Sequence, residues 1–417
     1  MAKKANKGHC VLCGRPEDEV PFLLEGVDGK VCPDCVALAM NMLGENQLLK
    51  ETKAQPFDSL ELDLKALPKP QDIKEHLDHY VVGQDEAKRY LSVAVYNHYK
   101  RLLQHQEPDD EVEIEKSNIL LLGPTGTGKT LLAKTIARLL QVPFTIVDAT
   151  VLTQAGYVGE DIESLLTRLL QVADYDVAAA ERGIVFIDEI DKIARKGDNP
   201  SITRDVSGEG VQQGLLKLLE GSIVNVPPQG GRKHPDQPMI QVNTQHILFI
   251  CAGAFDGIER KIAHRLNTRI VGYNSPGAQH AHLKEEELLR YVDARDLKSY
   301  GLIPEIIGRL PIITHLNPLT RDTLRMILTE PRNALTRQYT RMLAMDGIAL
   351  HYTEDALDAI VEKTMEQKLG ARGLRAIMEQ VMMEAMYRLP SEQVTEFTID
   401  RAYVEARLAE SQGVVQA

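Results

Sequence analysis

A glycine-rich run that ends in lysine and threonine, Gly123-Pro-Thr-Gly-Thr-Gly-Lys-Thr130, carries the strongest chemical signal in the sequence. It fits the pattern G-x-x-x-x-G-K-[ST], which binds nucleotide phosphates. Glycines let the backbone curl around an anion, and the N–H groups that open the following helix face it. We expect Lys129 to contact the β and γ phosphates of ATP and Thr130 to ligate Mg²⁺. The residues expected to hold the nucleotide here are Gly123, Pro124, Thr125, Gly126, Thr127, Gly128, Lys129, Thr130 and Leu131.

Two carboxylates follow a short apolar run at Ile184-Val-Phe-Ile-Asp-Glu189. The run predicts a buried strand with both acids at its exit. We expect Asp188 to hold Mg²⁺ through water, and Glu189 to orient and deprotonate the attacking water. An acidic turn without catalytic role is the alternative. Beside a phosphate-binding loop, however, the pair favours hydrolysis of ATP over binding alone.

Four cysteines form two C-x-x-C pairs near the N-terminus, Cys10 with Cys13 and Cys32 with Cys35. This spacing is typical of a zinc site in which four thiolates surround the ion. All four positions are then taken by the protein, so we expect a structural rather than a catalytic metal. Free thiols or a redox pair are the alternative. Cys251 lies in an apolar segment and is expected in the core.

The elements that must position these groups follow an α/β pattern. Apolar strands are expected at 118–122, 144–148, 184–188 and 246–251, and helical stretches alternate with them, which predicts a parallel sheet covered by helices. From about residue 320 the pattern becomes helical, with helical periodicity in 324–345 and 374–389. Thr320 and Thr353 are candidate N-caps.

Composition limits the classes that fit. The chain has 417 residues, of which 43% are hydrophobic and 26% charged, and its net charge is −12. That balance disfavours a broad grip on nucleic acid, which needs clustered Lys and Arg. We find no apolar run near the ~20 residues of a membrane helix, and no signal peptide. We therefore expect a cytoplasmic protein with no membrane and no nucleic-acid partner.

Several longer motifs make the whole chain resemble the ClpX family, AAA+ unfoldases of the Clp protease. They are Val82-Gly83-Gln84-Asp85-Glu86-Ala87-Lys88, Gly156-Tyr157-Val158-Gly159-Glu160-Asp161, the run from Arg204 to Gln213, Arg232-Lys233-His234, Gly308-Arg309-Leu310-Pro311 and Gly370-Ala-Arg372-Gly-Leu-Arg375. The resemblance implies a zinc-binding domain over 1–50, a linker over 51–67, a large AAA+ α/β domain over 68–316 and a small, mostly helical domain over 317–417.

The same resemblance implies a role for each motif. Val82 lies beside the adenine, and Arg372 is the sensor-2 arginine that touches the bound nucleotide. Arg309 is inserted into the ATP site of a neighbouring subunit. A structural salt bridge is the alternative for Arg309, and a solvated helix-end charge is the alternative for Arg372.

Further motifs belong to substrate handling in the family. Tyr157 and Val158 lie on a pore loop and Arg204 on a second one. A bulky side chain between Gly156 and Gly159 could grip an extended polypeptide, although an ordinary surface turn has the same spacing. Arg232, Lys233 and His234 would attract substrate tags that carry a C-terminal carboxylate, or form a solvated basic turn.

Two departures from the family pattern stand out. The tripeptide Ile-Gly-Phe, which docks into the peptidase ClpP, is replaced here by Val271-Gly272-Tyr273. No polar sensor-1 residue follows the expected strand 246–251, and none is assigned.

These observations predict a homo-hexameric, ATP-driven unfoldase and translocase that feeds tagged or unfolded proteins, some brought by adaptors, into ClpP. The zinc domain is expected to dimerise. ATP, Mg²⁺ and Zn²⁺ are the implied cofactors. Three alternatives remain at this level: a remodelling chaperone without a protease, a nucleic-acid motor, and a zinc-organised scaffold with a vestigial ATP site.

Overall fold

The computed structural model describes residues 9–16, 19–25, 29–36, 38, 67–104, 112, 114–153, 160–195, 208–227, 239–268, 285–367, 369–392 and 394–413. The chain divides into two compact units, Met1–Leu60 and Glu61–Ala417, and each is described by itself.

The N-terminal unit is built around cysteine rather than around a large apolar core. Strand β1 (Leu24–Glu25) pairs antiparallel with β2 (Lys30–Val31). Cys10, Val20 and Cys32 form its buried cluster. Leu24 and Leu38 are exposed, so they lie outside this cluster. A core this small needs a further source of stability, which a bound metal supplies.

A five-stranded parallel sheet organises the second unit, with strand order β11-β3-β10-β7-β4. This confirms the α/β class. Two of the expected strands, 144–148 and 184–188, are found as β4 and β7, and the other two are displaced slightly along the chain. The sheet strands are β3 (Ile119–Leu122), β4 (Phe144–Asp148), β7 (Ile184–Asp188), β10 (Leu248–Gly253) and β11 (Ile312–His315).

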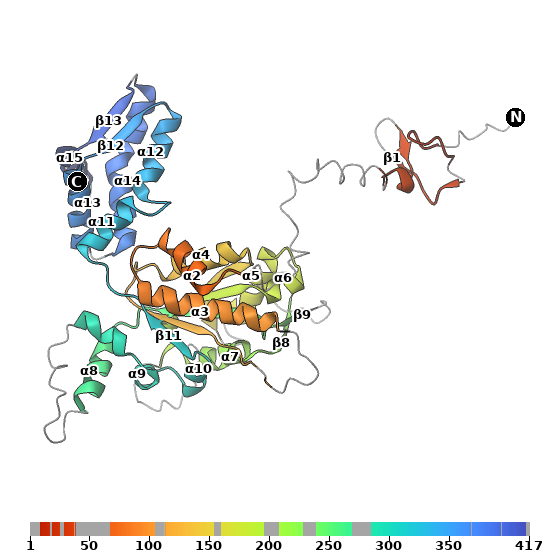
Figure 1. Ribbon diagram of the computed structural model, residues 1–417, viewed down its shortest axis with the longest axis horizontal. Coiled ribbons are helices and arrows are strands. Elements are labelled where there is room, and N and C mark those ends of the chain that lie inside the picture. The colour runs from red at the N-terminus through yellow and green to blue at the C-terminus, as the bar shows by residue number, and fades with distance from the viewer. Residues whose placement is uncertain are drawn as a thin grey trace. The chain divides into compact units, whose positions relative to one another are not determined.

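Helices cover both faces of this sheet (Figure 1). The helices of this part are α2 (Pro70–Asp78), α3 (Asp85–Leu102), α4 (Lys129–Leu140), α5 (Ser164–Val172), α6 (Val177–Glu181), α7 (Glu209–Glu220), α8 (Ile258–Thr268), α9 (Ala294–Tyr300) and α10 (Pro304–Gly308). Short pieces complete it: β5 (Leu152–Thr153), β6 (Glu160–Asp161), β8 (Ile223–Val226), β9 (Ile240–Asn243) and the 3-10 turns η2 (Ala149–Val151), η3 (Ile190–Ile193) and η5 (Glu285–Tyr291).

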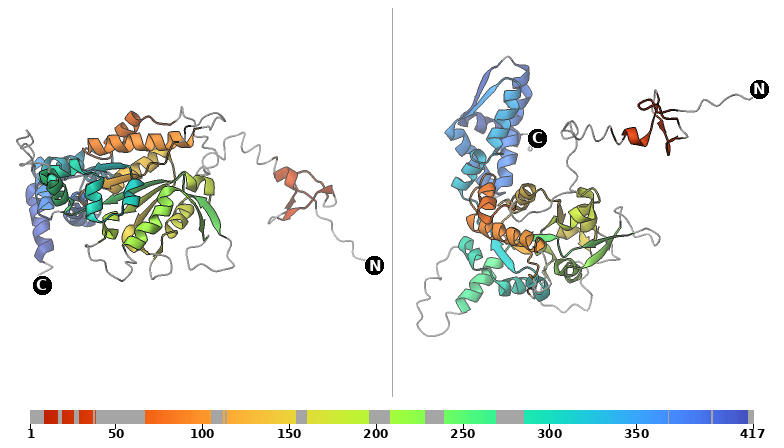
Figure 2. Two further views of the ribbon diagram at one scale, coloured as in Figure 1. Left: turned by 90° about the horizontal axis from the view of Figure 1, so that it is seen from below. Right: turned by 45° about the vertical axis from the view of Figure 1, so that its right-hand side comes forward.

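Alternation along the strands decides which helices each face meets. Ile119 and Leu121 of β3 point into one cluster with α2, α3 and α4, whereas Leu120 and Leu122 point into the other with α5, α7 and α10. This is the period of two that a strand imposes on its side chains. The first view of Figure 2 shows α3 on one side of the sheet and α7 on the other.

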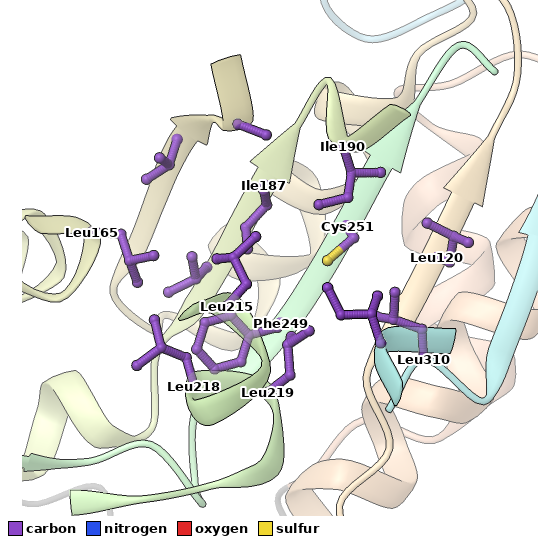
Figure 3. Close-up of a cluster of buried hydrophobic side chains, with 14 of the residues drawn as sticks. Leu120, Leu165, Ile187, Ile190, Leu215, Leu218, Leu219, Phe249, Cys251 and Leu310 are labelled. Atoms are coloured by element: carbon purple, nitrogen blue, oxygen red, sulfur yellow. The ribbon is translucent and has the colours of Figure 1, made fainter. Parts of the chain in front are cut away.

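Cys251 lies within the second of these clusters, as expected from its apolar segment. Its side chain lies in one cluster with Leu120, Ile187 and Leu310 (Figure 3) and is fully buried. Burial raises the pKa of the Cys251 thiol to about 12. This cysteine is therefore a small apolar core residue rather than a reactive group.

The C-terminal part of this unit is mostly helical, as expected, with its own apolar core. Its helices are α11 (Arg321–Thr329), α12 (Leu335–Met345), α13 (Glu354–Gln367), α14 (Ala371–Arg388), the 3-10 turn η6 (Leu389–Ser391) and α15 (Arg401–Gly413). Two parallel strands that we did not predict, β12 (Ala349–Tyr352) and β13 (Glu396–Ile399), pair beside them. Each is only four residues long, too short for a clear alternating pattern.

The periodic stretch 324–345 proves to be two helices rather than one. Pro331 lies between them, and it lacks the N–H and clashes with the preceding turn of a continuous helix. Both predicted N-caps are confirmed. The Thr320 hydroxyl accepts a hydrogen bond from Thr323 N at 3.2 Å, and the Thr353 hydroxyl accepts one from Ala356 N at 3.3 Å.

In the part of the chain that the structure describes, every helix is too short or too polar to cross a membrane.

Candidate active site

The glycine-rich loop joins β3 to α4 at the carboxyl edge of the sheet. Gly123 N donates to Gly253 O at 3.2 Å, which ties the start of the loop to the end of β10. Gly128 precedes the first turn of α4, so no side chain covers that helix N-terminus. The loop and the free N–H groups of the first helical turn form a cradle suited to phosphate oxygens.

Lys129 is folded onto this loop. Its Nζ donates to Gly123 O at 2.6 Å and to Pro124 O at 3.0 Å, and the side chain is buried. Burial lowers the pKa of the Lys129 amine, the nearby Arg372 lowers it further, and Asp188 opposes them. The amine therefore rests on carbonyl oxygens that a phosphate oxygen can replace as acceptor.

Asp188 and Thr130 meet where β7 ends. The Thr130 hydroxyl donates to Asp188 Oδ2 at 3.3 Å, although the two residues are 58 positions apart. A hydroxyl beside a carboxylate offers the oxygen ligands that Mg²⁺ prefers. The structure thus brings together Thr130, which the sequence predicts as a magnesium ligand, and Asp188, which it predicts to hold Mg²⁺ through water.

Glu189 turns the chain sharply out of the sheet. Its backbone lies in the left-handed region, with φ at 56°, and its N–H donates to Asp188 Oδ1 at 3.0 Å. This conformation is uncommon for a residue other than glycine. It exposes the Glu189 carboxylate at the carboxyl edge of the sheet.

Sequence reasoning missed Asp191, two residues further on. It is buried, and its Oδ1 accepts a hydrogen bond from Ala254 N at 3.2 Å. Asp191 therefore fixes the end of β10 against η3. In the sequence Asp191 lies between Ile190 and the charged Lys192, so the local pattern does not signal its burial. The end of β10 itself, Cys251-Ala-Gly-Ala254, carries no sensor-1 side chain.

The N-terminus of α14 contacts the same loop from the helical part of the unit. Ala371 N donates to Gly126 O at 3.3 Å. A Cβ on Gly126 would lie 2.7 Å from Leu369 O, and one on Gly370 would lie 2.9 Å from Thr125 O. Both glycines have positive φ, so glycine is needed here for conformation and for space. Arg372 is exposed beside this contact, near enough to Lys129 to affect its pKa.

The segment around Val82 lies beside the loop as well. Val82 is half-buried, and the Val81 side chain is the nearest neighbour of a Cβ on Gly128, at 3.8 Å. Lys88 fixes this segment, because its buried Nζ donates to Val81 O and to Asp78 Oδ1, both at 2.6 Å. An apolar surface formed by Val81 and Val82 next to the phosphate-binding loop is suited to packing against an adenine ring.

Arg309 takes part in an ion pair within its own chain. It follows α10, and its guanidinium donates to Glu220 Oε1 through Nη2 at 3.0 Å and Nε at 3.2 Å. The two side chains are about half exposed, at 50% and 42%. The salt bridge considered as an alternative is therefore present, on the surface, where it can be exchanged for another anion.

The residues assigned to substrate handling and docking lie outside the described residues. These are Tyr157, Val158, Arg204, Arg232, Lys233, His234, Val271, Gly272 and Tyr273.

The four N-terminal cysteines form a metal-binding cluster. Their Sγ atoms all lie within 4.8 Å of one another. A tetrahedron with Zn–S bonds of about 2.3 Å places sulfurs about 3.8 Å apart, so the set fits Zn²⁺. Burial raises the pKa of Cys10, but backbone N–H groups of Cys32, Cys13 and Leu12 outweigh it and lower that pKa to about 6. This favours the metal-binding thiolate form of Cys10, whereas side-chain hydrogen bonds with Cys13 and Cys32 raise the pKa of Cys35 to about 12.

Comparison with known families agrees with this division. A model described as the AAA domain (Cdc48 subfamily) matches residues 114–313, one for the C-terminal, D2-small domain of ClpB protein matches 319–404, and one for the ClpX C4-type zinc finger matches 8–45. With the site described above, the AAA domain makes the chain an ATPase that uses ATP with Mg²⁺. The zinc-finger match assigns Zn²⁺ to the four-cysteine cluster.

Curated relatives match almost from end to end. A protein of Porphyromonas gingivalis is 65% identical over 408 residues, 98% of each chain. One of Bacteroides fragilis is 62% identical over 405 residues, 97% of this chain and 96% of that protein. Both are named ATP-dependent Clp protease ATP-binding subunit ClpX. Identity of this degree over the full length, together with a zinc finger specific to the same proteins, shows that the chain belongs to the ClpX family.

Proposed function

We propose that the chain is one subunit of a homo-hexameric, ATP-driven protein unfoldase that threads its substrates into ClpP. The observation that carries the proposal is the contact between the phosphate-binding loop and the N-terminus of α14, through Gly126 and Gly370. Because this contact joins two parts with separate cores, a nucleotide at the loop acts on both. Its binding and hydrolysis can then change the angle between them. We retain the division into 1–50, 51–67, 68–316 and 317–417 as part of this proposal.

Hydrolysis is assigned to residues at the carboxyl edge of the sheet. Lys129 would move from the loop carbonyls to the phosphates. Thr130 directly, and Asp188 through water, would hold Mg²⁺, which would supply positive charge beside the phosphates. Glu189 accepts the proton of the attacking water. Val82 packs on the base, while residues 123–128 and Leu131 surround the phosphates.

Two arginines connect this chemistry to movement and to the neighbouring subunit. Arg372, at the start of α14, reaches the phosphates from the helical part and reports the nucleotide state to it. Arg309 exchanges Glu220 for the γ-phosphate of the next subunit in the ring, where it stabilises the charge that develops during hydrolysis. The exposed, salt-bridged position of Arg309 supports this assignment, because such an ion pair costs little to break.

Substrate handling is proposed from the family. Tyr157, Val158 and Arg204 grip the polypeptide in a central pore, and Arg232, Lys233 and His234 attract its carboxylate tag. Val271, Gly272 and Tyr273 dock on ClpP. The names of the relatives support this role, because they describe those proteins as subunits of the Clp protease. The zinc domain dimerises and receives adaptors and substrates. We also propose a cytoplasmic location, and chaperone activity without the peptidase.

The decisive experiment follows degradation of a stably folded, tagged protein by the chain with its cognate ClpP and ATP. We expect degradation with ATP and none with ADP. Without ClpP we expect unfolding of the same substrate, detected by loss of its fluorescence. Degradation that proceeds without ATP, or ATPase stimulation by DNA but not by unfolded protein, would contradict the proposal.

A further inference from the structure

Helix α7 ends at a set of side chains that satisfy its last carbonyl groups, which have no partner within the helix. The Ser222 hydroxyl donates to Lys217 O at 3.0 Å, and Lys116 Nζ donates to Leu218 O at 3.3 Å. The fully buried Asn118 donates from Nδ2 to Leu219 O at 3.0 Å.

Asn118 differs from the other two because its second acceptor lies at the end of α10, whereas the second acceptor of Lys116 is Thr244 O, at 2.7 Å. The same Nδ2 donates to Arg309 O at 2.9 Å, 191 positions along the chain. The amide of Asn118 thus joins the end of α7 to the backbone of Arg309, which directly follows α10 and whose side chain is exposed. Asn118 lies directly before β3, the strand that leads into the phosphate-binding loop, so it is held firmly by the sheet.

A second amide joins the same two helices at the other end of α10. Gln212, in α7, is fully buried. Its Nε2 donates to Ile193 O at 2.9 Å and Gly301 O at 3.2 Å, and its Oε1 accepts from Ile303 N at 2.8 Å. Ile303 is the residue before α10, and Ile193 ends the turn that follows Glu189.

Glu220, the last residue of α7, holds the Arg309 guanidinium itself. The short helix α10 is therefore fixed to α7 by Gln212 at its start and by Asn118 at its end, and the arginine that follows it is aligned by Glu220. Each of these contacts is a side-chain hydrogen bond. The two amides are buried, and hydrogen bonds are electrostatically stronger in the protein interior than in water.

We propose that Asn118, Gln212 and Glu220 are positioning residues that set where Arg309 is presented to the neighbouring ATP site. This inference rests on the role of Arg309 proposed above. It adds that the chain of bonds from Ile193 through Gln212 to α10 ties the position of Arg309 to the turn that follows Glu189 in its own subunit. An arginine of this kind is worth about 10³–10⁵ in turnover, so small displacements have large effects.

Asn118→Ala tests the backbone anchor. We expect kcat for ATP to fall by about tenfold or more, since a misplacement of about 1 Å can cost about 10²-fold. Affinity for a fluorescent ADP analogue should stay unchanged, because Arg309 is proposed to contact the γ-phosphate, which ADP lacks. Ser222→Ala is the matched control, since it uncaps the same helix without touching Arg309, and its kcat should match the unsubstituted protein. An equal loss in both variants would show that capping alone matters and would overturn the inference.

Glu220→Ala provides a test that does not depend on a buried position. The side chain is exposed, so the fold should be kept, and we expect a lower kcat with unchanged ADP affinity. A kcat that is unchanged or raised would refute the positioning role of Glu220.

Mixed rings separate a displaced arginine from damage to the variant's own site. Subunits with Asn118→Ala are assembled with Glu189→Gln subunits, which do not hydrolyse ATP but present an intact Arg309. If the inference holds, ATP turnover per Asn118→Ala subunit rises in the mixture. Arg309→Ala mixed with Glu189→Gln is the reference. A gain in the reference without a gain for Asn118→Ala overturns the inference alone. No gain in the reference shows that the trans role of Arg309 has failed, and the inference fails with it.

Discussion

The side-chain amide of Gln84 exchanges two hydrogen bonds with the backbone of Asn317. Gln84 Nε2 donates to Asn317 O, and Asn317 N donates to Gln84 Oε1, both at 2.8 Å. Gln84 is buried two residues after Val82, which we place at the adenine, and Asn317 lies between β11 and α11. The segment that we propose binds the base is therefore hydrogen-bonded directly to the connection between the sheet and the helical part.

Breaking this pair should uncouple nucleotide binding from movement of the helical part. Gln84 has a φ of 59°, so we choose Gln84→Gly, which tolerates that conformation, to avoid adding strain. The variant loses two hydrogen bonds of about 1 kcal/mol each. We therefore expect the number of ATP molecules hydrolysed for each substrate molecule unfolded to rise severalfold. Nucleotide affinity should change little. The measurement is ATP consumed per substrate molecule unfolded, and an unchanged ratio would count against the coupling.

Substitution of Gly370 by alanine should weaken nucleotide binding. The new Cβ would lie 2.9 Å from Thr125 O, and φ at +59° already disfavours alanine, so the start of α14 must move away from the loop. At a strain of about 1–3 kcal/mol, affinity should fall about tenfold to hundredfold. Gly347→Ala is the control, because its φ of +80° is also positive but its surroundings are open. Equal affinities in the two variants would contradict the importance of the contact.

Replacing Glu189 by glutamine should separate binding from hydrolysis. The amide has nearly the same shape but accepts no proton, so we expect turnover to fall by about 10²–10⁴-fold with ATP affinity retained. Phosphate release and equilibrium binding measure the two. Normal turnover would remove Glu189 from the role of base.

Acid should destabilise the second unit through His98. Burial, helped by the charges of Arg101 and Lys116, lowers the pKa of this histidine to about 3 from 6.5, while its bond to His246 O opposes the shift. Between pH 3 and pH 6.5 the unfolded chain binds a proton at His98 and the folded chain does not. The free energy of unfolding therefore has its full value above pH 6.5 and decreases as the pH falls below that value. By pH 5 the loss is about 2 kcal/mol.

The measurement compares urea unfolding at pH 7.5 and pH 5 for the unsubstituted chain and for His98→Gln, which cannot titrate. The difference in free energy of unfolding between the unsubstituted chain and His98→Gln should become smaller, or change sign, at pH 5. His351→Gln is the control, because His351 is exposed. An identical pH dependence in all three proteins would exclude His98 as a source.

Removal of zinc should unfold the N-terminal unit but leave basal ATPase activity intact. The four cysteines belong to Met1–Leu60, and every described group of the ATP site belongs to Glu61–Ala417. Zinc binding supplies on the order of 10 kcal/mol to a unit of this kind, so a zinc-selective chelator in excess Mg²⁺ should unfold it. Protease sensitivity of the N-terminal unit and ATPase rate report the two effects. Loss of basal ATPase on chelation would show that the units are coupled.

Local spacing is what the sequence by itself determined about this protein. The loop from Gly123 to Thr130, the pair Asp188-Glu189 and the four cysteines each carry their chemistry within a few adjacent positions. Beside a glycine-rich loop that binds phosphate, acids at the exit of an apolar strand favour hydrolysis over binding alone. The parallel sheet followed from the same kind of evidence, because its strands are short, apolar and separated by helical stretches.

Only the tertiary structure decided how these local pieces are joined. The amide of Asn118 meets Arg309, Gln84 meets Asn317, and Gly126 meets Gly370, each across a long separation in sequence. Neither amide belongs to a motif whose spacing reveals its partner. Such contacts depend on which strands become neighbours and on how β3 and α7 pack. The balance of burial and hydrogen bonding over the whole fold sets that arrangement, which no short window of sequence contains.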